Sequence, residues 1–535
     1  MNTENNSNEV NNSNIPQIFF KSITFNDNTK LNLEHNSIIV FTGANNCGKS
    51  QILKDAENFL DASNNLPKIV IRDIEPEYLG NFDNKEFLNK SFIINNDANL
   101  QLIGTAFAIP KDNWIQFWSQ RTLVNQLYKL FIRRLSTEYR LIASSPLNRS
   151  GTLGSSPIYY LNKSEILTHK ISDYFHQAFG VDLVLNRNDM STIPLHVGEC
   201  PDQKAYTMDR QDEYYEKVLK LPQLHKQGDG MRSFASILLD TFTSEHNITL
   251  IDEPEAFLHP PQARILGRML AQNNPHNRQL FIATHSEAFL QGLLEADVQN
   301  VTVVRINRID NINHISILKN DEIRNLWSTP LLRYSNILSG LFHEKVILCE
   351  SDYDCLFYQA LIDAMFEHSI ERQPDILFTH CGGKDRMKDI IKALKALNVP
   401  IVAICDFDVI NNNNTFKQIA EAFELPWDSL QSEGMKEVYD YINAKNSSGQ
   451  NFRYFIKRTG KKSFDGASYT SYEKVETLCK RAGLFIIPVG EMECFDKSIN
   501  KSKKDWVYHV LESSNLATKS ELFEARQFIT SVINF

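Results

Sequence analysis

Short apolar runs alternate with amphipathic stretches in two separate parts of the chain. In the first part, apolar runs at residues 18–23 and 37–42 predict strands, and the second run leads through a glycine-rich turn into a helix that begins near Lys49. The alternation returns later in three strands and one helix, expected at residues 248–251, 279–284, 301–306 and 261–272. This order predicts an α/β domain with a parallel sheet.

A second run of strands and helices occupies the region near residues 343–410. Its five expected elements are strands at 345–349, 376–379 and 401–405 and helices at 353–366 and 384–397. This order predicts an independent βαβαβ unit. Two polar stretches that follow it, residues 411–415 and 443–451, are expected to be loops.

The region between the first strands and residue 220 is less regular, except for one apolar stripe at helical spacing. The stripe contains Trp114, Phe117, Trp118, Val124, Leu127, Tyr128, Phe131 and Leu135. It predicts a long helix that packs against a neighbour, and we interpret residues 105–215, approximately, as a helical dimerisation insert.

Length and charge narrow the class of protein. The 535 residues argue for two to four domains. The 56 basic and 65 acidic side chains give a net charge of −9, which excludes a globally basic nucleic-acid coat protein. A nucleic-acid site must therefore be a local basic patch, and residues 453–462 contain one, formed by Arg453, Lys457, Arg458, Lys461 and Lys462.

The expected location is the cytoplasm. The polar residues 1–14 resemble a disordered tail rather than a signal peptide, and the sequence contains no apolar run long enough to cross a membrane. The eight cysteines are scattered and include no C-x-x-C pair, so we expect reduced, buried thiols.

The glycine-rich turn at residues 43–50 fits the phosphate-binding pattern G-x-x-x-x-G-K-[ST], and it has the strand before it and the helix after it that this pattern requires. Lys49 is expected to reach the β- and γ-phosphates and Ser50 to coordinate Mg²⁺. The loop residues expected to contact ATP are Gly43, Asn45, Asn46, Gly48, Lys49 and Ser50.

Two adjacent carboxylates end the strand at 248–251. We expect Asp252 to bind the Mg²⁺ of the nucleotide and Glu253 to act as the general base that activates water. The next strand ends at His285, which we expect to sense the γ-phosphate.

Residues 252–260 and 283–286, with the sequences DEPEAFLHP and ATHS, resemble the ABC-type ATPase heads of SMC, RecF and OLD (overcoming-lysogenisation-defect) proteins. The resemblance implies that a signature loop of one head closes over ATP bound by another. The matching turn contains Gly228 and Gly230 and departs from the L-S-G-G-Q form of transporter heads. We therefore expect self-association as a dimer or tetramer through the ATPase domains.

A second group of carboxylates follows the strands at 345–349 and 401–405. Glu350 ends the first strand, and Asp406 and Asp408 follow the second. Because parallel strands end at one edge of a sheet, these groups are expected to converge, which is unfavourable unless cations neutralise them. The sequence therefore predicts bound Mg²⁺ or Mn²⁺.

With the Gly-Gly-Lys turn at residues 382–384, this order resembles a TOPRIM domain, the metal-dependent module of topoisomerases, primases and OLD nucleases. Ser351 stands where that family usually has glycine, and Asp354 matches the second acidic position of the OLD pattern. A later acidic ligand is assigned to Glu493 rather than Glu491. The lysine that stabilises the transferred phosphate is assigned to Lys504, with Lys503 as the alternative.

The two resemblances together cover most of residues 15–510 and match the OLD nucleases. The expected fold is α/β: a tail at 1–14, an ABC-type P-loop ATPase domain at 15–320 with its helical insert, a linker at 321–342, and a TOPRIM domain at 343–535 with a C-terminal helical extension. The resemblance implies ATP-gated DNA cleavage in phage defence, by two metal ions on Glu350, Asp354, Asp406, Asp408 and Glu493.

Some relatives are retron effectors encoded beside a reverse transcriptase, which makes this enzyme and its nucleic-acid product candidate partners. Two other functions stay open: a TOPRIM ribonuclease, and an ATP-switched scaffold with a vestigial nuclease site. Ser351 favours the scaffold, whereas Glu350, Asp406 and Asp408 argue against it. A topoisomerase needs a placed nucleophilic tyrosine, and none of the 18 tyrosines has a sequence context that marks it as one.

Overall fold

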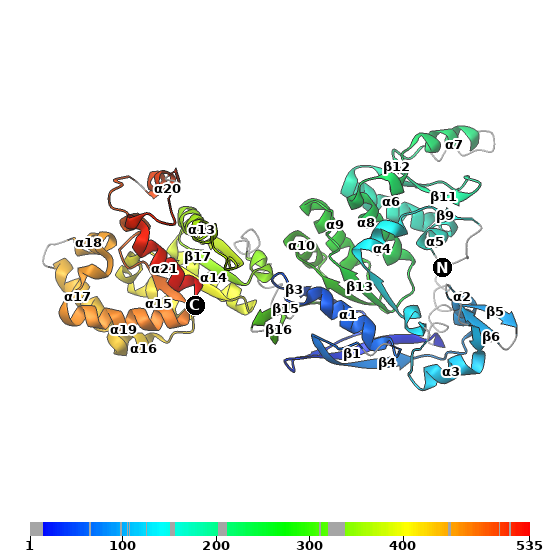
Figure 1. The fold of residues 1–535 in the computed structure, drawn as a ribbon, viewed down its shortest axis with the longest axis horizontal. Coiled ribbons are helices and arrows are strands. Elements are labelled where there is room, and N and C mark those ends of the chain that lie inside the picture. The colour runs from blue at the N-terminus through cyan, green and yellow to red at the C-terminus, as the bar shows by residue number, and fades with distance from the viewer. Residues whose placement is uncertain are drawn as a thin grey trace, which may run out of the picture. The chain divides into compact units, whose positions relative to one another are not determined.

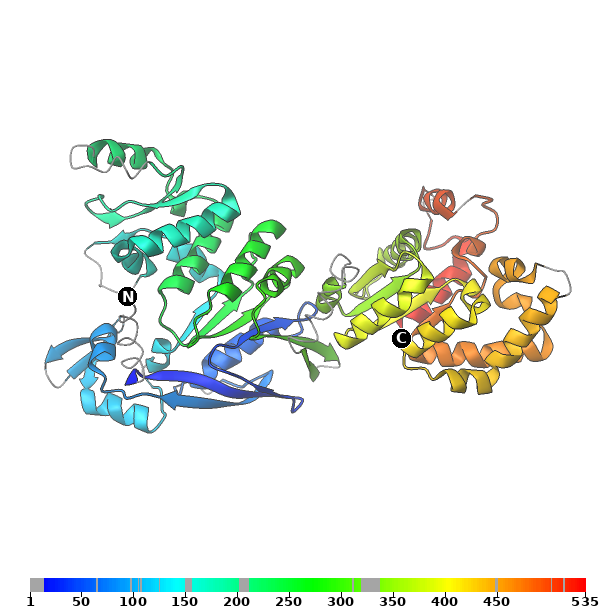
Figure 2. The same cartoon turned by 180° about the vertical axis from the view of Figure 1, so that it is seen from behind.

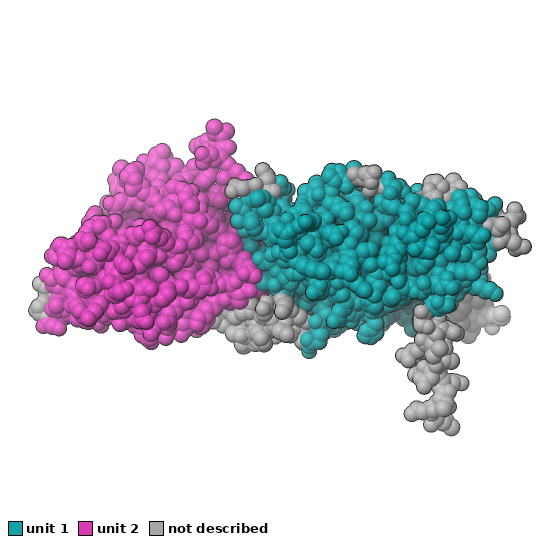
Figure 3. Space-filling view, turned by 90° about the horizontal axis from the view of Figure 1, so that it is seen from below, with its two compact units in different colours: residues 1–321 teal, residues 322–535 magenta. Residues whose placement is uncertain are grey.

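The structure is a computed structural model that describes most of the chain. The described residues are 14–63, 66–96, 99–103, 105, 108–124, 126–149, 156–201, 211–309, 312–318, 337–447, 451–501, 503–512 and 515–535. The chain divides into two compact units, Met1–Asp321 and Glu322–Phe535, which are coloured separately in Figure 3. Nearly all of the expected tail and most of the expected linker lie outside the described residues.

A six-stranded sheet forms the centre of the first unit (Figure 1). Its strands pair in the order β16 (Ile312–Leu318), β15 (Val301–Ile309), β3 (Ile38–Thr42), β14 (Gln279–Ala283), β13 (Ile248–Asp252) and β8 (Ile132–Leu135). All neighbours are parallel except β15 and β16. The middle strands β3 and β14 are buried along their whole length, as in parallel sheets that are covered on both faces.

Smaller antiparallel sheets and the helices complete this unit. The remaining strands are β1 (Gln17–Phe25), β2 (Lys30–Asn32), β4 (Ile71–Leu79), β5 (Phe92–Asn96), β6 (Asn99–Leu102), β7 (Ala108–Pro110), β9 (Leu147–Asn148), β10 (Asp182–Leu185), β11 (Thr192–Ile193) and β12 (Leu195–Gly198). The described helices are α1 (Lys49–Leu60), α2 (Lys85–Ser91), α3 (Lys111–Ser119), α4 (Thr137–Ala143), α5 (Pro157–Lys163), α6 (Glu165–Phe179), α7 (Gln211–Lys220), α8 (Asp229–Thr243), α9 (Pro260–Gln272) and α10 (Glu287–Glu295).

The strands and helices predicted from the first alternating pattern are confirmed, and their register brings three chain segments to one edge. Asp252 at the end of β13 lies level with Ala283 of β14, and Ala283 lies level with Phe41 of β3. The segments that follow these strands therefore meet at the carboxyl edge of the sheet, where α/β proteins place their ligand sites.

The prediction of one long helix along the apolar stripe is wrong. Helix α3 ends at Ser119, a 3₁₀ turn (η2) covers Leu127–Leu130, and the last stripe residue, Leu135, belongs to β8 at the edge of the central sheet. Arg121 and Gln126 adopt positive φ angles of 56° and 65°, which a continuous helix does not allow. Four residues of the stripe are buried, with Trp114 and Leu127 at 0% exposure, and the other four are half-buried. The dimerisation role of residues 105–215 stays a prediction.

A four-stranded parallel sheet forms the centre of the second unit (Figure 2). Its strands pair in the order β18 (Ile376–His380), β17 (Lys345–Cys349), β19 (Ile401–Cys405) and β20 (Leu484–Ile486). The described helices are α13 (Asp352–Phe366), α14 (Lys384–Ala396), α15 (Asn413–Ala422), α16 (Trp427–Leu430), α17 (Lys436–Ser447), α18 (Phe452–Thr459), α19 (Gly466–Ala482), α20 (Lys503–Glu512) and α21 (Phe523–Ile533). The predicted βαβαβ order is confirmed, and helices α15 to α19 lie between β19 and β20 in the sequence.

Both polar stretches expected to be loops are partly helical. Helix α15 begins at Asn413, because the Asn412 side chain accepts hydrogen bonds from the backbone of residues 414 and 415 and caps the helix. Helix α17 continues to Ser447. None of the described helices is long and apolar enough to cross a membrane. All eight cysteines are free thiols, and five are buried.

Candidate active sites

The loop after β3 is a tight glycine-rich turn. Gly43, Asn46 and Gly48 have positive φ angles of 142°, 62° and 106°, and a side chain at Gly43 would collide with the backbone oxygen of Ile306. Asn45 and Asn46 are exposed at its tip. The loop therefore has the glycine-dependent backbone that a phosphate cradle needs.

Lys49 folds back across this loop. Its Nζ donates hydrogen bonds to the carbonyl oxygens of Gly43 at 2.8 Å and Ala44 at 2.7 Å. Burial lowers the pKa of Lys49, although the nearby Cys47 thiol opposes this shift. The ammonium group is thus held by neutral acceptors at the loop.

The structure brings Ser50 and Asp252 together across 202 residues of sequence. The Ser50 hydroxyl donates to Oδ1 of Asp252 at 2.8 Å. A hydroxyl and a carboxylate are oxygen ligands of the kind that Mg²⁺ prefers, so the pair fits the nucleotide-bound cation expected from the sequence.

Glu253 and His285 also meet, as their positions after adjacent strands predict. Nε2 of His285 lies 3.6 Å from Oε1 of Glu253, and the His285 backbone N–H donates to Glu255 at 2.6 Å. Burial, with a further contribution from Lys49, lowers the pKa of His285 to about 4. The imidazole is therefore neutral near pH 7, and it lies beside the proposed general base. Burial raises the pKa of Glu255.

Arg140 is a buried residue of this region that the sequence patterns did not identify. Its guanidinium donates to the carbonyl oxygens of Asp252 at 2.6 Å and Glu253 at 2.9 Å, and to the Ser233 hydroxyl at 2.9 Å. It therefore connects α4, α8 and the end of β13. Its partners lie about 100 residues away in sequence and are mostly backbone atoms, so no local pattern could have revealed the role.

Gly228 and Gly230 open helix α8. Gly228 is its N-cap, and a side chain at Gly230 would lie 2.6 Å from the carbonyl oxygen of Phe257. This turn therefore lies against the segment that follows the Asp252 carboxylate. Phe257 has a positive φ of 68° and is 54% exposed, so the turn borders an exposed aromatic ring.

In the second unit, Glu350 and Asp406 converge at the carboxyl edge of the sheet. Strands β17 and β19 are parallel neighbours, and Oε1 of Glu350 accepts a hydrogen bond from the backbone N–H of Asp406 at 3.0 Å. Asp408 lies two residues further on. With Asp354, Glu491 and Glu493, these residues form what we call the carboxylate cluster. The predicted convergence is confirmed.

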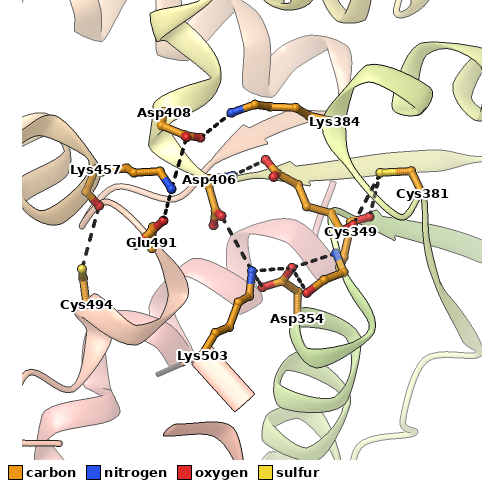
Figure 4. A network of polar contacts seen from close by, with 12 residues as sticks. Cys349, Asp354, Cys381, Lys384, Asp406, Asp408, Lys457, Glu491, Cys494 and Lys503 are labelled. Atoms are coloured by element: carbon orange, nitrogen blue, oxygen red, sulfur yellow. Dashed lines mark hydrogen bonds and ion pairs between the residues drawn. The ribbon is translucent and has the colours of Figure 1, made fainter. Parts of the chain in front are cut away.

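Three lysines lie against the carboxylate cluster, two of which come from distant helices (Figure 4). Lys384 pairs with Asp408 at 2.9 Å. Lys457 lies 2.6 Å from Glu491 and 3.5 Å from Asp408. Lysine ammonium groups thus neutralise part of the charge for which the sequence had suggested metal ions alone.

The third lysine is Lys503, not the assigned Lys504. Nζ of Lys503 lies 2.8 Å from Asp354 and 3.7 Å from Asp406, whereas Lys504 is exposed. Successive residues of a helix point about 100° apart, so only one of the two neighbours on α20 faces the cluster. The assignment of Lys504 is corrected to Lys503.

Burial dominates the electrostatics of the cluster. It raises the pKa of Glu350 to about 7, against the opposing attraction of Lys384. Burial and then the charge of Glu350 hold the pKa of Asp406 well above its usual range. Burial also raises the pKa of Glu493. A nearby positive charge would therefore stabilise the ionised form of these carboxyl groups.

The fit to a divalent cation rests on the type of ligand. Among the described residues, no group of three acidic, histidine or cysteine side chains is already arranged to hold a metal ion. All the clustered ligands are carboxylates, however, and Oε2 of Glu493 is buried without a hydrogen-bond donor within the described part of the chain. Such oxygen donors suit Mg²⁺ and Mn²⁺.

Ser351 has a structural role of its own. It is the N-cap of α13, where its hydroxyl and its backbone N–H donate to Oδ2 of Asp354 at 2.8 and 2.9 Å. Asp354 thereby belongs both to the helix cap and to the cluster.

Comparison with known proteins identifies both units. Residues 38–291 match the family described as "AAA domain, putative AbiEii toxin, Type IV TA system", and residues 341–408 match "Overcoming lysogenization defect protein-like, TOPRIM domain". The chain therefore combines an AAA-type ATPase domain with an OLD-like TOPRIM domain. The first unit therefore carries an ATPase domain and the second a TOPRIM domain, and these imply use of a nucleotide and a divalent metal.

The chain is 27% identical over 217 residues to a protein of Thermus scotoductus named OLD nuclease. The match spans 37% of the chain and 38% of that relative. Among solved structures, an SMC head bound to the C-terminal winged-helix domain of ScpA overlaps 57% of the chain and 99% of its own length, with 12% identity and a TM-score of 0.35. The SMC head domain of Thermotoga maritima overlaps 56% and 98%, with 12% identity and a TM-score of 0.30.

Proposed function

We propose that the chain is an ATP-gated, metal-dependent endonuclease that cleaves DNA at the carboxylate cluster. The observation that carries the proposal is the convergence of Glu350 and Asp406, with Asp408, at the carboxyl ends of adjacent parallel strands. The cluster lies in the domain that matches the OLD-like TOPRIM family, and the Thermus relative is named as a nuclease.

Two divalent cations would activate a water molecule and stabilise the leaving oxygen of the phosphodiester. The residues proposed to hold them are Glu350, Asp354, Asp406, Asp408 and Glu493. Lys503 is proposed to stabilise charge on the transferred phosphate. Because Lys384, Lys457 and Lys503 already pair with these carboxylates, cation binding must displace or rearrange some of the ion pairs.

In the ATPase domain, the proposed roles follow the geometry of the nucleotide site. Lys49 would leave its carbonyl partners for the β- and γ-phosphates, and Ser50 and Asp252 would bind the Mg²⁺ of ATP. Glu253 would activate water, and the neutral His285 beside it would sense the γ-phosphate.

The exposed turn at Gly228 and Gly230, beside Phe257, supports a contact with ATP on a second chain, and so a dimer or tetramer. ATP binding would then control access to the nuclease site. We place this activity in cytoplasmic anti-phage defence, with a reverse transcriptase and its nucleic-acid product as candidate partners, on the basis of the family resemblance.

The proposal is tested with the purified full chain on plasmid, linear and single-stranded DNA and on RNA, with Mg²⁺ or Mn²⁺, with and without ATP. Cleavage of DNA should require the metal, and Asp406→Ala should reduce it on the order of 10³-fold or more. The control is Asp389→Ala, an exposed carboxylate on α14. Preferential cleavage of RNA would replace DNA by RNA as the substrate, and no cleavage with ATP binding intact would favour the scaffold function.

A further inference from the structure

Helix α18 exposes two neighbouring aromatic rings. Phe452 and Ile456 are buried and anchor the helix, whereas Tyr454 is 54% exposed and Phe455 is 50% exposed. Single exposed apolar residues are common on protein surfaces, but here two exposed rings follow one another on one short helix, about 100° apart around its axis. We call Tyr454 and Phe455 the aromatic pair.

Basic residues surround the aromatic pair. The guanidinium of Arg458 lies over the Tyr454 ring, 5.4 Å from its centre. Among the described residues, Arg453, Arg458 and Lys461 form no ion pair with a carboxylate. Lys497 donates to the carbonyl oxygen of Arg458 near the end of the helix at 3.2 Å. The surface around the rings is therefore positively charged and free to attract phosphates.

The same helix reaches the carboxylate cluster through Lys457, whose Nζ contacts Glu491 and Asp408 (Figure 4). Arg453 and Tyr454 lie four and three residues before Lys457, so they share its face of the helix, one turn or about 5.4 Å away. Arg453 and Tyr454 therefore lie beside the residue that connects this helix to the cluster.

We infer that α18 is a platform for unpaired nucleotides, on which Tyr454 and Phe455 stack against bases while Arg453, Arg458 and Lys461 contact phosphates. The direction of the strand toward the cluster rests on the proposed nuclease function. Aromatic side chains stack on any unpaired base, since every base has a π-face, whereas the faces of paired bases are covered inside a duplex. A duplex would meet only the basic residues, so the platform selects single-stranded, frayed or unwound nucleic acid.

The test measures binding to the full chain in EDTA, without divalent cations, so that no cleavage occurs. Fluorescence anisotropy is recorded with a labelled single-stranded DNA of about 20 nucleotides, longer than the roughly 4–16 nucleotides that stacking platforms cover, with RNA of the same sequence, and with the blunt DNA duplex. Tyr454→Ala and Phe455→Ala should each weaken single-strand binding roughly 10-fold and leave duplex binding within about 2-fold.

Two controls separate stacking from other effects. Tyr454→Phe keeps a ring and should bind single strands as the wild type does. Tyr469→Ala removes a half-buried tyrosine of α19 that lies beside Glu473 and Glu476, and it should change neither affinity. Arg458→Gln should weaken single strands and duplex alike and reduce the salt dependence of both.

Single-strand affinity that is unchanged in both alanine variants, or that falls equally for single strand and duplex, would overturn the platform. If the alanine variants lose affinity equally for DNA and RNA strands, the platform binds the stacking face that both kinds of base share. If they lose affinity for the DNA strand alone, the platform is specific for DNA. Stacking on Tyr454 without any metal-dependent cleavage would refute the nuclease function and keep the platform. Cleavage with unaltered binding in the alanine variants would do the reverse.

Discussion

The two candidate sites are built alike but hold their charges differently. Both lie at the carboxyl edge of a parallel sheet, where acidic residues follow neighbouring strands. At the nucleotide site, Asp252 is held by the Ser50 hydroxyl, and Lys49 donates to carbonyl oxygens. At the carboxylate cluster, the lysines pair with the acids directly, as Lys503 does with Asp354.

The difference follows from the charge that each site is proposed to receive. A nucleotide brings its own negative charge, so a lysine that is not tied to a carboxylate can turn to the phosphates. The cluster instead contains six carboxyl groups, Glu350, Asp354, Asp406, Asp408, Glu491 and Glu493, against three lysines, an excess of 6 − 3 = 3 acidic groups. Burial raises the pKa of three of them, so added cations are favoured there.

The largest expected effect concerns the two neighbouring lysines of α20, each of which is replaced by methionine in a separate variant. Lys503→Met removes the ammonium group between Asp354 and Asp406, and cleavage should fall by about 10²–10³-fold, the cost of losing one charged group that stabilises a transition state. Lys504→Met is the matched control, since Lys504 is exposed. Its cleavage rate should stay within about 2-fold of the wild type. Equal losses, measured as initial rates at saturating Mg²⁺, would contradict the choice of Lys503.

Sequence patterns predicted those parts of the sites that depend on local order. Glu350 and Asp406 follow apolar strands directly, so their convergence follows once the strands are parallel. The sequence named Lys503 only as the alternative to Lys504 and did not pair Lys457 with the cluster, because Lys457 and Lys503 come from helices 49 and 97 residues beyond Asp408 and Asp406, respectively. No local pattern determines which side chain of a distant helix faces a site.

The prediction of one long helix from Trp114 to Leu135 failed for a related reason. The apolar residues from Trp114 to Leu135 are buried or half-buried, as their spacing suggests, but helical spacing alone does not reveal a break of the backbone. The positive φ angles of Arg121 and Gln126 redirect the chain, so that its last part joins the central sheet as β8. Burial was therefore predictable here, whereas the element that buries these residues was not.

Arg140 provides the second test, because it supports the nucleotide site without touching a carboxylate. Its side chain is fully buried, and Arg140→Met would leave the carbonyl oxygens of Asp252 and Glu253 without this donor. The ATPase unit should lose about 2–3 kcal/mol of unfolding free energy. In calorimetry this appears as a fall of roughly 4–12 °C in its Tm.

Arg372→Met is the control for the Arg140 substitution. Arg372 and Glu344 both lie in the second unit and form a surface ion pair at 2.8 Å. Its removal should lower the unfolding free energy by less than about 1 kcal/mol. A Tm of Arg140→Met equal to that of the wild type would show that other donors or water replace the guanidinium.

The smallest expected effect concerns pH and His285. Burial and Lys49 lower its pKa to about 4 in the folded chain, against about 6.5 when unfolded. As the pH falls from about 6.5 to 4, the unfolded imidazole takes up a proton that the folded one refuses, so the ATPase unit loses stability. Because the ring is 34% exposed, solvent screening should limit this loss to less than about 1 kcal/mol.

Urea unfolding of the full chain at about pH 7.5 and 5.5, a span that includes the unfolded pKa, measures this dependence. In His285→Asn, the unfolding free energy of the ATPase unit should differ less between the two pH values than in the wild type. In His169→Asn, which replaces an exposed histidine of α6, the difference should stay as in the wild type. An unchanged difference in His285→Asn would mean that the folded imidazole titrates as it does in the unfolded chain. Burial would then not favour the neutral form of His285 at the nucleotide site. The two sites would differ in this respect, because burial favours the uncharged form of Glu350 in the carboxylate cluster.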